Sequence, residues 1–130
     1  SDFIKPLLDV GCRVSLFVEP DEHQLEASAE IGATVVELHT GAYCDYHAEG
    51  SNRSALDELA RISRCSIFAN KLGLEVHAGH GLTFENVSPI AAIPQIMELN
   101  IGHFLIGESV FTGLDNAISK MRRLMVEARL

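Results

Sequence analysis

Hydrophobic and polar positions follow two different patterns along this chain. Short runs rich in β-branched and apolar residues, each bounded by proline, glycine or polar residues, are typical of buried β-strands. Longer segments of helix-forming residues lie between them. The runs that predict strands are 14–19, 34–40, 74–78 and 98–101.

The intervening segments predict helices. Residues 21–31 carry strong helix formers up to Gly32, which ends the helix. A polar stretch at 45–53 predicts a connection rather than a helix, and the apolar stretch at 87–97, with its two prolines, predicts a brief helix. Helical spacing in the next long segment, which Gly73 ends, predicts a buried stripe of Leu56, Leu59, Ala60, Ser63 and Ile67. The clearest stripe is in the last helix: Leu114, Ala117, Ile118, Met121, Leu124, Met125 and Ala128.

Strands that alternate with helices predict a parallel sheet, because each crossover returns the next strand in the same direction. Both common closures of this pattern, the doubly wound sheet and the (β/α)8 barrel, bind ligands at the carboxyl ends of their strands. Polar side chains gather at those predicted ends. We therefore expect one carboxylate and four histidines to converge near one rim: Glu37, His39, His77, His80 and His103.

His80 is the strongest single candidate for chemistry. It lies between Gly79 and Gly81, where the strand at 74–78 stops and a loop begins. Glycines allow a sharp turn and a close approach of the backbone to a ligand, and an imidazole can give or take a proton near neutral pH. The alternative is a loop histidine that hydrogen-bonds to the backbone.

Composition narrows the class of protein. The chain has 130 residues, of which 47% are hydrophobic, and this is enough for one domain with a buried core. A net charge of -8 argues against a nucleic-acid binder. The three cysteines lack CxxC spacing, so neither a disulfide framework nor a zinc ribbon is expected, and the cytoplasm is the expected location. No apolar run approaches the roughly 18 residues of a membrane span.

Five short motifs together resemble a known family. They are VSLFVEP at 14–20, VVELHTGAY at 35–43, VHAGHGL at 76–82, AAIP at 91–94 and ELNIGHFLIG at 98–107. Their order and intervals, from about Val14 to the C-terminus, resemble the second half of pyridoxine 5'-phosphate synthase. The resemblance implies a TIM (β/α)8 barrel, of which this chain supplies roughly the last four βα units. Residues 1–11 would then be the end of the preceding helix.

The resemblance also implies roles for individual residues. His80 would be a proton donor or acceptor in closing the pyridine ring of vitamin B6, and Glu37 would stabilise a charged transition state. Gly81, Gly102 and His103 would bind the aminoketone phosphate through the backbone. The reaction condenses 1-deoxy-D-xylulose 5-phosphate with 3-amino-2-oxopropyl phosphate and releases phosphate and water. It requires no metal and no organic cofactor.

Alternatives remain for several residues. The turn Gly107-Glu108-Ser109 competes for the phosphate, although Glu108 would repel it. His77 stands where the family resemblance leads us to expect asparagine. It could titrate beside His80, but replacing an amide hydrogen bond is the favoured interpretation. A metal-dependent isomerase is a further alternative, and its metal ligands would come from Glu37, His39, Cys44, His47 and His80. A solvated loop is the preferred interpretation.

The resemblance covers half a barrel, and this limits what the chain can do. The family's other bases, and the arginines that hold the sugar phosphate, would lie on strands before Ser1. Four βα units also leave two open sheet edges. We therefore predict that the chain is inactive without the N-terminal half-barrel, and we expect a homo-oligomer, an octamer by family resemblance. The second hypothesis is a non-catalytic, phosphate-binding half-barrel that assembles with itself.

Overall fold

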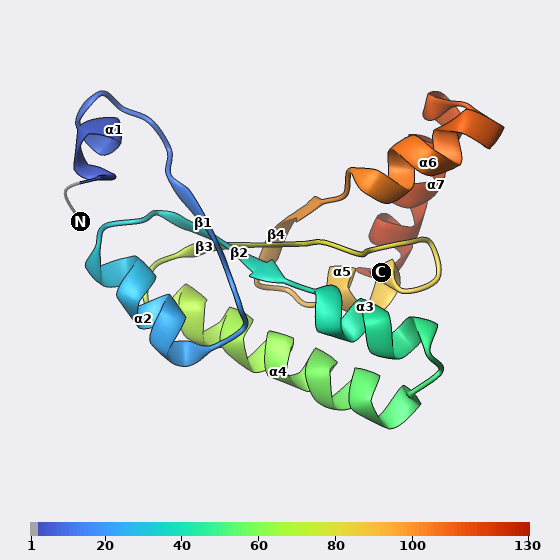
Figure 1. Cartoon of the computed structure of the whole chain (residues 1–130), viewed down its shortest axis with the longest axis horizontal. Helices are drawn as coiled ribbons and strands as arrows, with labels where there is room; N and C mark the ends of the chain where they lie inside the picture. Colours follow the sequence, from blue (N-terminus) through green and yellow to red (C-terminus); the bar gives the residue numbers. More distant parts are fainter. Residues whose placement is uncertain (1–2) are drawn as a thin grey trace.

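A parallel sheet organises the computed structural model, which describes residues 3–130 (Figure 1). Its strands are β1 (Ser15–Val18), β2 (Val35–His39), β3 (Glu75–Gly79) and β4 (Ile96–Asn100). They pair in the order β1-β2-β3-β4, and every pair is parallel. The four predicted strands are therefore confirmed, although β4 begins two residues earlier than the sequence pattern indicated. A register shift between Val76 and His77 marks an irregularity where β4 pairs with β3.

Seven helices accompany these strands in the described residues. A short helix, α1 (Lys5–Asp9), lies within the stretch at 1–11 where the end of a helix was expected, while residues 1 and 2 of that stretch lie outside the described residues. The others are α2 (Glu22–Glu30), α3 (Gly41–Ala48), α4 (Asn52–Lys71), α5 (Val87–Ala91), α6 (His103–Thr112) and α7 (Leu114–Glu127).

The helices that connect the strands cover one face of the sheet. Consecutive parallel strands that lie side by side place their right-handed crossovers on the same face. Val36 and Leu38 of β2 and Val76 and Ala78 of β3 point to that face, where they are completely buried. Figure 1 shows α2, α3 and α4 together beneath the strands. This one-sided covering is compatible with a sector of a barrel, whereas a doubly wound sheet has helices on both faces.

One predicted connection is a helix. The stretch at 45–53 was expected to be a polar connection, but α3 begins at Gly41, directly after β2, and continues to Ala48. Tyr43 and Cys44 are its buried side chains, 2% and 5% exposed. Because so few apolar residues are buried in this helix, its sequence lacks the repeating apolar spacing that reveals a longer helix.

The buried face of α4 is also shifted from the prediction. Leu56 and Ile67, both in the predicted stripe, are 65% and 41% exposed. The stripe that meets the sheet is shifted around the helix and consists of Ala55, Ile62, Cys65, Ser66 and Ala69. These side chains are mostly small, so the helix can lie close to the strands. A pattern of large apolar residues therefore pointed to the wrong face.

The last helix is confirmed, with part of its stripe left uncovered. Ala117 and Met121 are buried in α7, but Leu114 and Ile118 are 52% and 39% exposed. The opposite end of the helix is tied to the sheet by Arg129, whose guanidinium donates hydrogen bonds to the carbonyl oxygens of Ala91 (2.7 Å), Ile93 (3.4 Å) and Ile96. Within the described residues, no helix is both long and apolar enough to cross a membrane.

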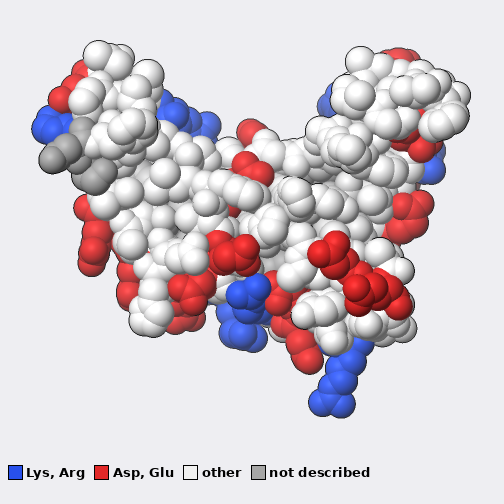
Figure 2. Space-filling model, in the orientation of Figure 1, with Lys and Arg blue, Asp and Glu red and all other residues white. Residues whose placement is uncertain are grey.

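The molecule is hollowed above the sheet. In the space-filling view, the part with α1 and the part with α6 and α7 stand up on either side of the middle (Figure 2). Phe17, which lies on β1 with its side chain in this open region, is 57% exposed. The face opposite the connecting helices is thus accessible at the carboxyl ends of the strands.

The corrected face of α4 gives a test by paired substitutions. Ile62→Ala should lower the free energy of unfolding by about 2–5 kcal/mol, because it opens a cavity under a fully buried side chain. Leu56→Ala should change it by less than about 0.5 kcal/mol, because Leu56 is mostly exposed. Urea unfolding of both variants measures the difference. Equal losses would contradict the observed face.

Candidate active site

A cleft of about 640 Å³ lies at the carboxyl ends of the strands. Its lining comes from β1, β2, the loop after β3, and the turn from β4 into α6: Phe17, Glu37, His80, Gly81, Leu82, Thr83, Asn100, Ile101, Gly102, His103 and Phe104. All five residues proposed as site residues from the sequence are in this set. These lining residues of the described chain include no lysine or arginine.

His80 follows β3 in an unusual backbone conformation. Its φ is +80°, and it is the one non-glycine residue with positive φ in the part of the chain that the structure describes. Gly81 continues the turn with φ of +81°. A side chain other than glycine in this region costs about 1–3 kcal/mol and persists where neighbouring contacts hold it. Such a cost at a residue that lines a cleft points to a functional position.

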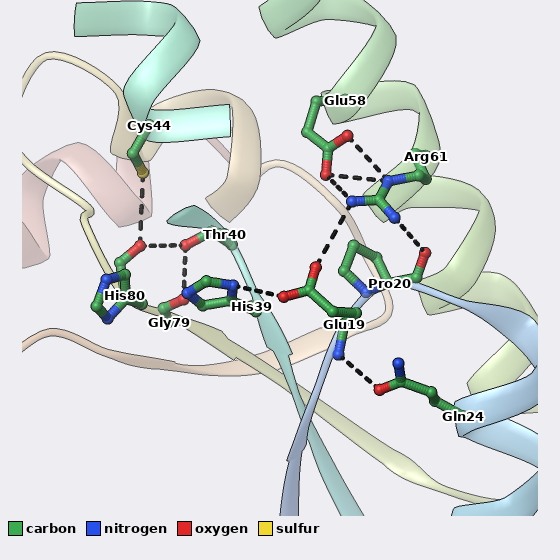
Figure 3. Close-up of polar contacts among 10 residues, drawn as sticks. All are labelled: Glu19, Pro20, Gln24, His39, Thr40, Cys44, Glu58, Arg61, Gly79 and His80. Atoms are coloured by element: carbon green, nitrogen blue, oxygen red, sulfur yellow. Dashed lines mark hydrogen bonds and ion pairs between the residues drawn. The ribbon is translucent and has the colours of Figure 1, made fainter. Parts of the chain in front are cut away.

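The start of α3 holds this turn in place. The Thr40 hydroxyl is completely buried and lies 2.7 Å from the carbonyl oxygen of Gly79 and 2.6 Å from that of His80 (Figure 3). Because the hydroxyl has one proton, the two acceptors share it. The backbone N–H of Thr40 also donates to the Gly79 oxygen at 2.9 Å. Thr40 thus fixes the two carbonyl groups that define the reversal at His80.

Cys44, one turn further along α3, supports the same turn. Its thiol donates to the His80 carbonyl oxygen at 3.5 Å. Burial raises the pKa of the Cys44 thiol to about 11, so it remains a neutral donor at physiological pH. A Cβ at Gly81 would come within 2.9 Å of the Cys44 Cβ, and glycine is therefore required both by φ and by contact. Cys44 is a packing and hydrogen-bonding residue in this arrangement.

The loop after His80 is held by Asn86. The Asn86 side chain accepts from the Thr83 N–H at 2.7 Å and donates to the Gly81 carbonyl oxygen at 3.3 Å. The Tyr43 hydroxyl of α3 donates to the Asn86 carbonyl oxygen at 2.9 Å. Burial, with a smaller contribution from Cys44, raises the pKa of Tyr43 to about 12, so its proton stays in this bond. The backbone beside the cleft is therefore closely fixed.

Glu37 reaches the cleft from β2. One carboxylate oxygen, Oε2, accepts a hydrogen bond of 2.7 Å from the Asn100 side chain at the end of β4. The other, Oε1, lies over Gly79, where any Cβ would collide with it and would come within 2.8 Å of the Asn100 carbonyl oxygen. Gly79 therefore leaves the space that Glu37 occupies. One oxygen of the carboxylate is fixed by Asn100, and the other packs over Gly79.

The far wall of the cleft is the beginning of α6. Gly102 is the N-cap residue, no side chain caps the helix, and His103 is its first residue. The first amides of a helix have no partner within it and suit a phosphate group. The competing turn of Gly107, Glu108 and Ser109 is excluded as a helix start, because all three residues lie inside α6. The Ser109 hydroxyl donates instead to the Leu105 carbonyl oxygen.

Two of the histidines expected at the rim do not line the cleft. His39 stands behind His80, with ring centroids 4.7 Å apart, and does not line the cleft. His77 lies lower in the sheet, where its ring nitrogens face Glu75 at 2.8 Å and Glu98 at 3.6 Å. His77 therefore contacts two carboxylates on the open face and does not line the cleft with His80. That it replaces an amide hydrogen bond stays a prediction.

The Glu75 carboxylate is shared between two partners. The hydrogen bond from His77, and then that from Arg13, hold the pKa of Glu75 below its ordinary value. Across the described residues, no group of three or more His, Cys, Asp and Glu side chains is arranged to hold a metal ion. Of the ligands considered from the sequence, the Cys44 thiol faces a backbone carbonyl, and the His47 ring lies 6.2 Å from that of Tyr43.

Several residues that shape the site were missed from the sequence. Thr40, Asn86 and Asn100 carry no catalytic signature of their own, and their importance follows from hydrogen bonds between distant segments. Asn100 could have been found by register, since it pairs with Gly79 and shares the inner face with Glu37. Thr40 had one signal, its position directly before a glycine at the end of a strand.

Comparison with known proteins identifies relatives of the chain. The family model described as pyridoxal phosphate biosynthesis protein PdxJ matches residues 1–127. Proteins named pyridoxine 5'-phosphate synthase are similar to it: the one from Ruegeria pomeroyi is 62% identical and the one from Roseobacter denitrificans 61%, each over 98% of this chain. The one from Caulobacter vibrioides is 55% identical over the whole chain. The chain spans about half the length of these relatives, 51% in each case.

Because Thr40 holds the turn at His80, removing its hydroxyl should lower the stability of the protein. Thr40→Val keeps the shape but removes the hydroxyl, and it should lower the free energy of unfolding by about 1–3 kcal/mol because buried carbonyl groups lose their donor. Thr40→Ser, which keeps the hydroxyl, should cost less. Urea unfolding measures the cost, and faster amide hydrogen exchange at 80–83 in Thr40→Val would show that the turn is released. A Thr40→Val protein with unchanged exchange there would contradict this role.

Proposed function

Because this chain belongs to the family of the pyridoxal phosphate biosynthesis protein PdxJ, we propose that it is the C-terminal half of a pyridoxine 5'-phosphate synthase. The observation that carries the proposal is the cleft, which unites His80, Glu37 and the start of α6 at the carboxyl ends of parallel strands. This is the edge at which enzymes of this architecture bind their ligands. The family and its named relatives support a role in vitamin B6 biosynthesis.

The complete fold in this proposal is a (β/α)8 barrel. Three features support it: strands that are neighbours in sequence order, connecting helices on one face, and an opposite face that remains open. A second half of equal size would pair with the free edges of β1 and β4. It would also cover Met97 of β4, which is 66% exposed beside a groove of about 370 Å³ formed with α7.

The proposed reaction condenses 1-deoxy-D-xylulose 5-phosphate with 3-amino-2-oxopropyl phosphate to give pyridoxine 5'-phosphate, phosphate and water. Closing the ring requires several proton transfers, and His80 brings to the cleft an imidazole, a group that can both give and take a proton. Glu37, with one oxygen held by Asn100 and the other unpaired, would stabilise the positive charge that develops when the amine attacks a carbonyl.

The phosphate of the aminoketone would lie at the start of α6. Backbone amides of Gly102 and His103, together with Gly81 across the cleft, would hold it. A Cβ at Gly102 would meet no atom within 4 Å, so glycine is not required there by the packing of the protein itself. A requirement for glycine would therefore come from the bound phosphate, which needs close approach to the backbone.

The charge of the cleft supports the proposal that another half of the barrel completes the site. Two phosphorylated substrates bring several negative charges, and the lining residues of the described chain include a carboxylate but no lysine or arginine. Phosphate groups are usually matched by such cations. We therefore propose that the N-terminal half-barrel supplies them, and that the chain works together with that half in a homo-oligomer. Exposed Val110 and Phe111 of α6, 77% and 87% exposed, offer apolar area for further contacts.

The need for a second half is testable directly. The chain alone should show no turnover of the two substrates, because its cleft lining offers no lysine or arginine for the phosphates. The complete protein, meaning this chain together with the half that completes the barrel, should form pyridoxine 5'-phosphate. Chromatographic detection of product measures both. Turnover by the chain alone would contradict the proposal that a second half is needed. A folded complete protein that binds phosphate but forms no product would favour a non-catalytic phosphate-binding half-barrel.

A substitution tests the role of His80. In the complete protein, His80→Asn should lower kcat by about 100- to 10,000-fold, the usual size of a lost general acid or base. Asparagine tolerates positive φ, so the turn should keep its shape. His23→Asn is the matched control, because the His23 side chain is 93% exposed on α2. Activity of His80→Asn equal to that of the control would refute the assignment.

A further inference from the structure

A chain of polar contacts runs from α4 to His39, whose ring packs against that of His80. It begins with Glu58 and Arg61, passes through Glu19 at the end of β1, and reaches His39 on β2 (Figure 3). None of these four residues lines the cleft. They therefore act on the cleft through the lining residues that His39 contacts, which are His80 and Phe17.

His39 has a fixed position between three neighbours. Its Nδ1 lies 2.8 Å from Glu19 Oε1, and the Phe17 ring meets it edge-on, with centroids 5.0 Å apart. On the remaining side, the His39 and His80 rings are tilted by 52° with centroids 4.7 Å apart. The rings approach each other because residue 41 is glycine. A Cβ there would lie 2.8 Å from His39 Cε1 and 3.3 Å from His80 Cδ2.

Glu19 is itself held from two directions. Its backbone N–H donates to the Gln24 side chain at 3.0 Å, and its carboxylate lies 3.7 Å from the Arg61 guanidinium. Arg61 in turn is fixed by Glu58, with contacts between 2.5 and 3.0 Å, and donates to the Pro20 carbonyl oxygen at 3.3 Å. The carboxylate therefore meets His39 in a defined direction rather than as a mobile surface charge.

This contact decides which nitrogen of His39 carries the proton. A carboxylate can only accept, so Nδ1 must donate to Glu19, and in the neutral ring Nε2 is then unprotonated. A fixed tautomer also fixes the orientation of the ring, as in carboxylate–histidine pairs that orient catalytic imidazoles. The His39 ring then forms a stationary wall behind His80.

We propose that Glu19 and His39 are positioning residues for His80, with Arg61 as the anchor of Glu19. This proposal rests on the proposed role of His80 as the proton-transfer group. The left-handed turn fixes the backbone of His80, but the side chain can still rotate about χ1 and χ2. The His39 ring limits that rotation and keeps the imidazole directed into the cleft. A misplacement of about 1 Å in such a group can cost roughly 100-fold in rate.

The test compares variants in the complete protein. Glu19→Gln removes the group that can only accept a hydrogen bond from His39, and His39→Gln removes the ring behind His80. Each substitution should lower kcat about 10- to 100-fold. The KM for both substrates should stay within about twofold, because neither residue lines the cleft. Glu19→Asp keeps a carboxylate and should retain more of the kcat than Glu19→Gln. Glu30→Gln, an equal loss of charge at an exposed position on α2, is the matched control.

A spectroscopic measurement separates positioning from a general loss of stability. The ring 15N shifts of His39 should show the proton on Nδ1 in the unmodified protein and a mixture of tautomers in Glu19→Gln. An unchanged tautomer, or Glu19→Gln and His39→Gln proteins that keep the kcat of the Glu30→Gln control, would overturn the positioning role. A rise in KM with unchanged kcat would overturn it as well.

The same set of variants distinguishes the two levels of the proposal. If His80→Asn abolishes turnover while Glu19→Gln and His39→Gln do not lower kcat, the positioning role fails and the role of His80 stands. If His80→Asn itself keeps full activity, the proposed role of His80 fails, and the positioning role fails with it.

Discussion

The reversal of the chain at His80 is the constraint on which the site depends. Two successive residues with positive φ turn the backbone directly after β3, and one of them carries a side chain that disfavours this conformation. The compensation comes from α3, where Thr40 and Cys44 donate to the His80 carbonyl oxygen. Because α3 starts directly after β2, the end of one strand holds the loop that follows its neighbour. The imidazole, Gly81 and the cleft backbone take their places from this contact.

The same geometry explains why the helix α3 must lie against the sheet rather than in solvent. A donor that fixes a strained turn has to be fixed itself, and Thr40 and Cys44 are both buried. The pKa values of Cys44 and Tyr43, both raised by burial, keep these groups protonated and therefore able to donate. Buried neutral donors hold the turn without adding charge near the cleft. Glu37 is then the carboxylate of a lining that also contains two imidazoles.

The sequence predicted the strands well because their signal is local. Runs such as 34–40 are apolar, β-branched and bounded by turn residues, and the structure places β2 within that run. It failed at α3 and at the buried face of α4, where the deciding contacts lie between segments far apart in the chain. Small side chains at Ala55, Cys65 and Ala69 are buried because the sheet is close, and this cannot be read from their hydropathy. The resemblance, and the tendency of ligands to bind at the carboxyl ends of parallel strands, pointed to the cleft residues. The residues that hold them in place follow only from the three-dimensional structure.

The net charge of the chain disfavours anionic ligands, whereas the groups within the cleft favour them. A chain with a net charge of -8 repels phosphates at long range, yet much of its acidic surface lies on the helices away from the cleft (Figure 2). Charges separated by more than about 10 Å are largely screened at physiological salt, so the groups within the cleft decide what binds. There the start of α6 offers uncapped amides, and the lining contains two imidazoles and one carboxylate. The cleft therefore favours an anionic group at its α6 wall and positive charge beside Glu37.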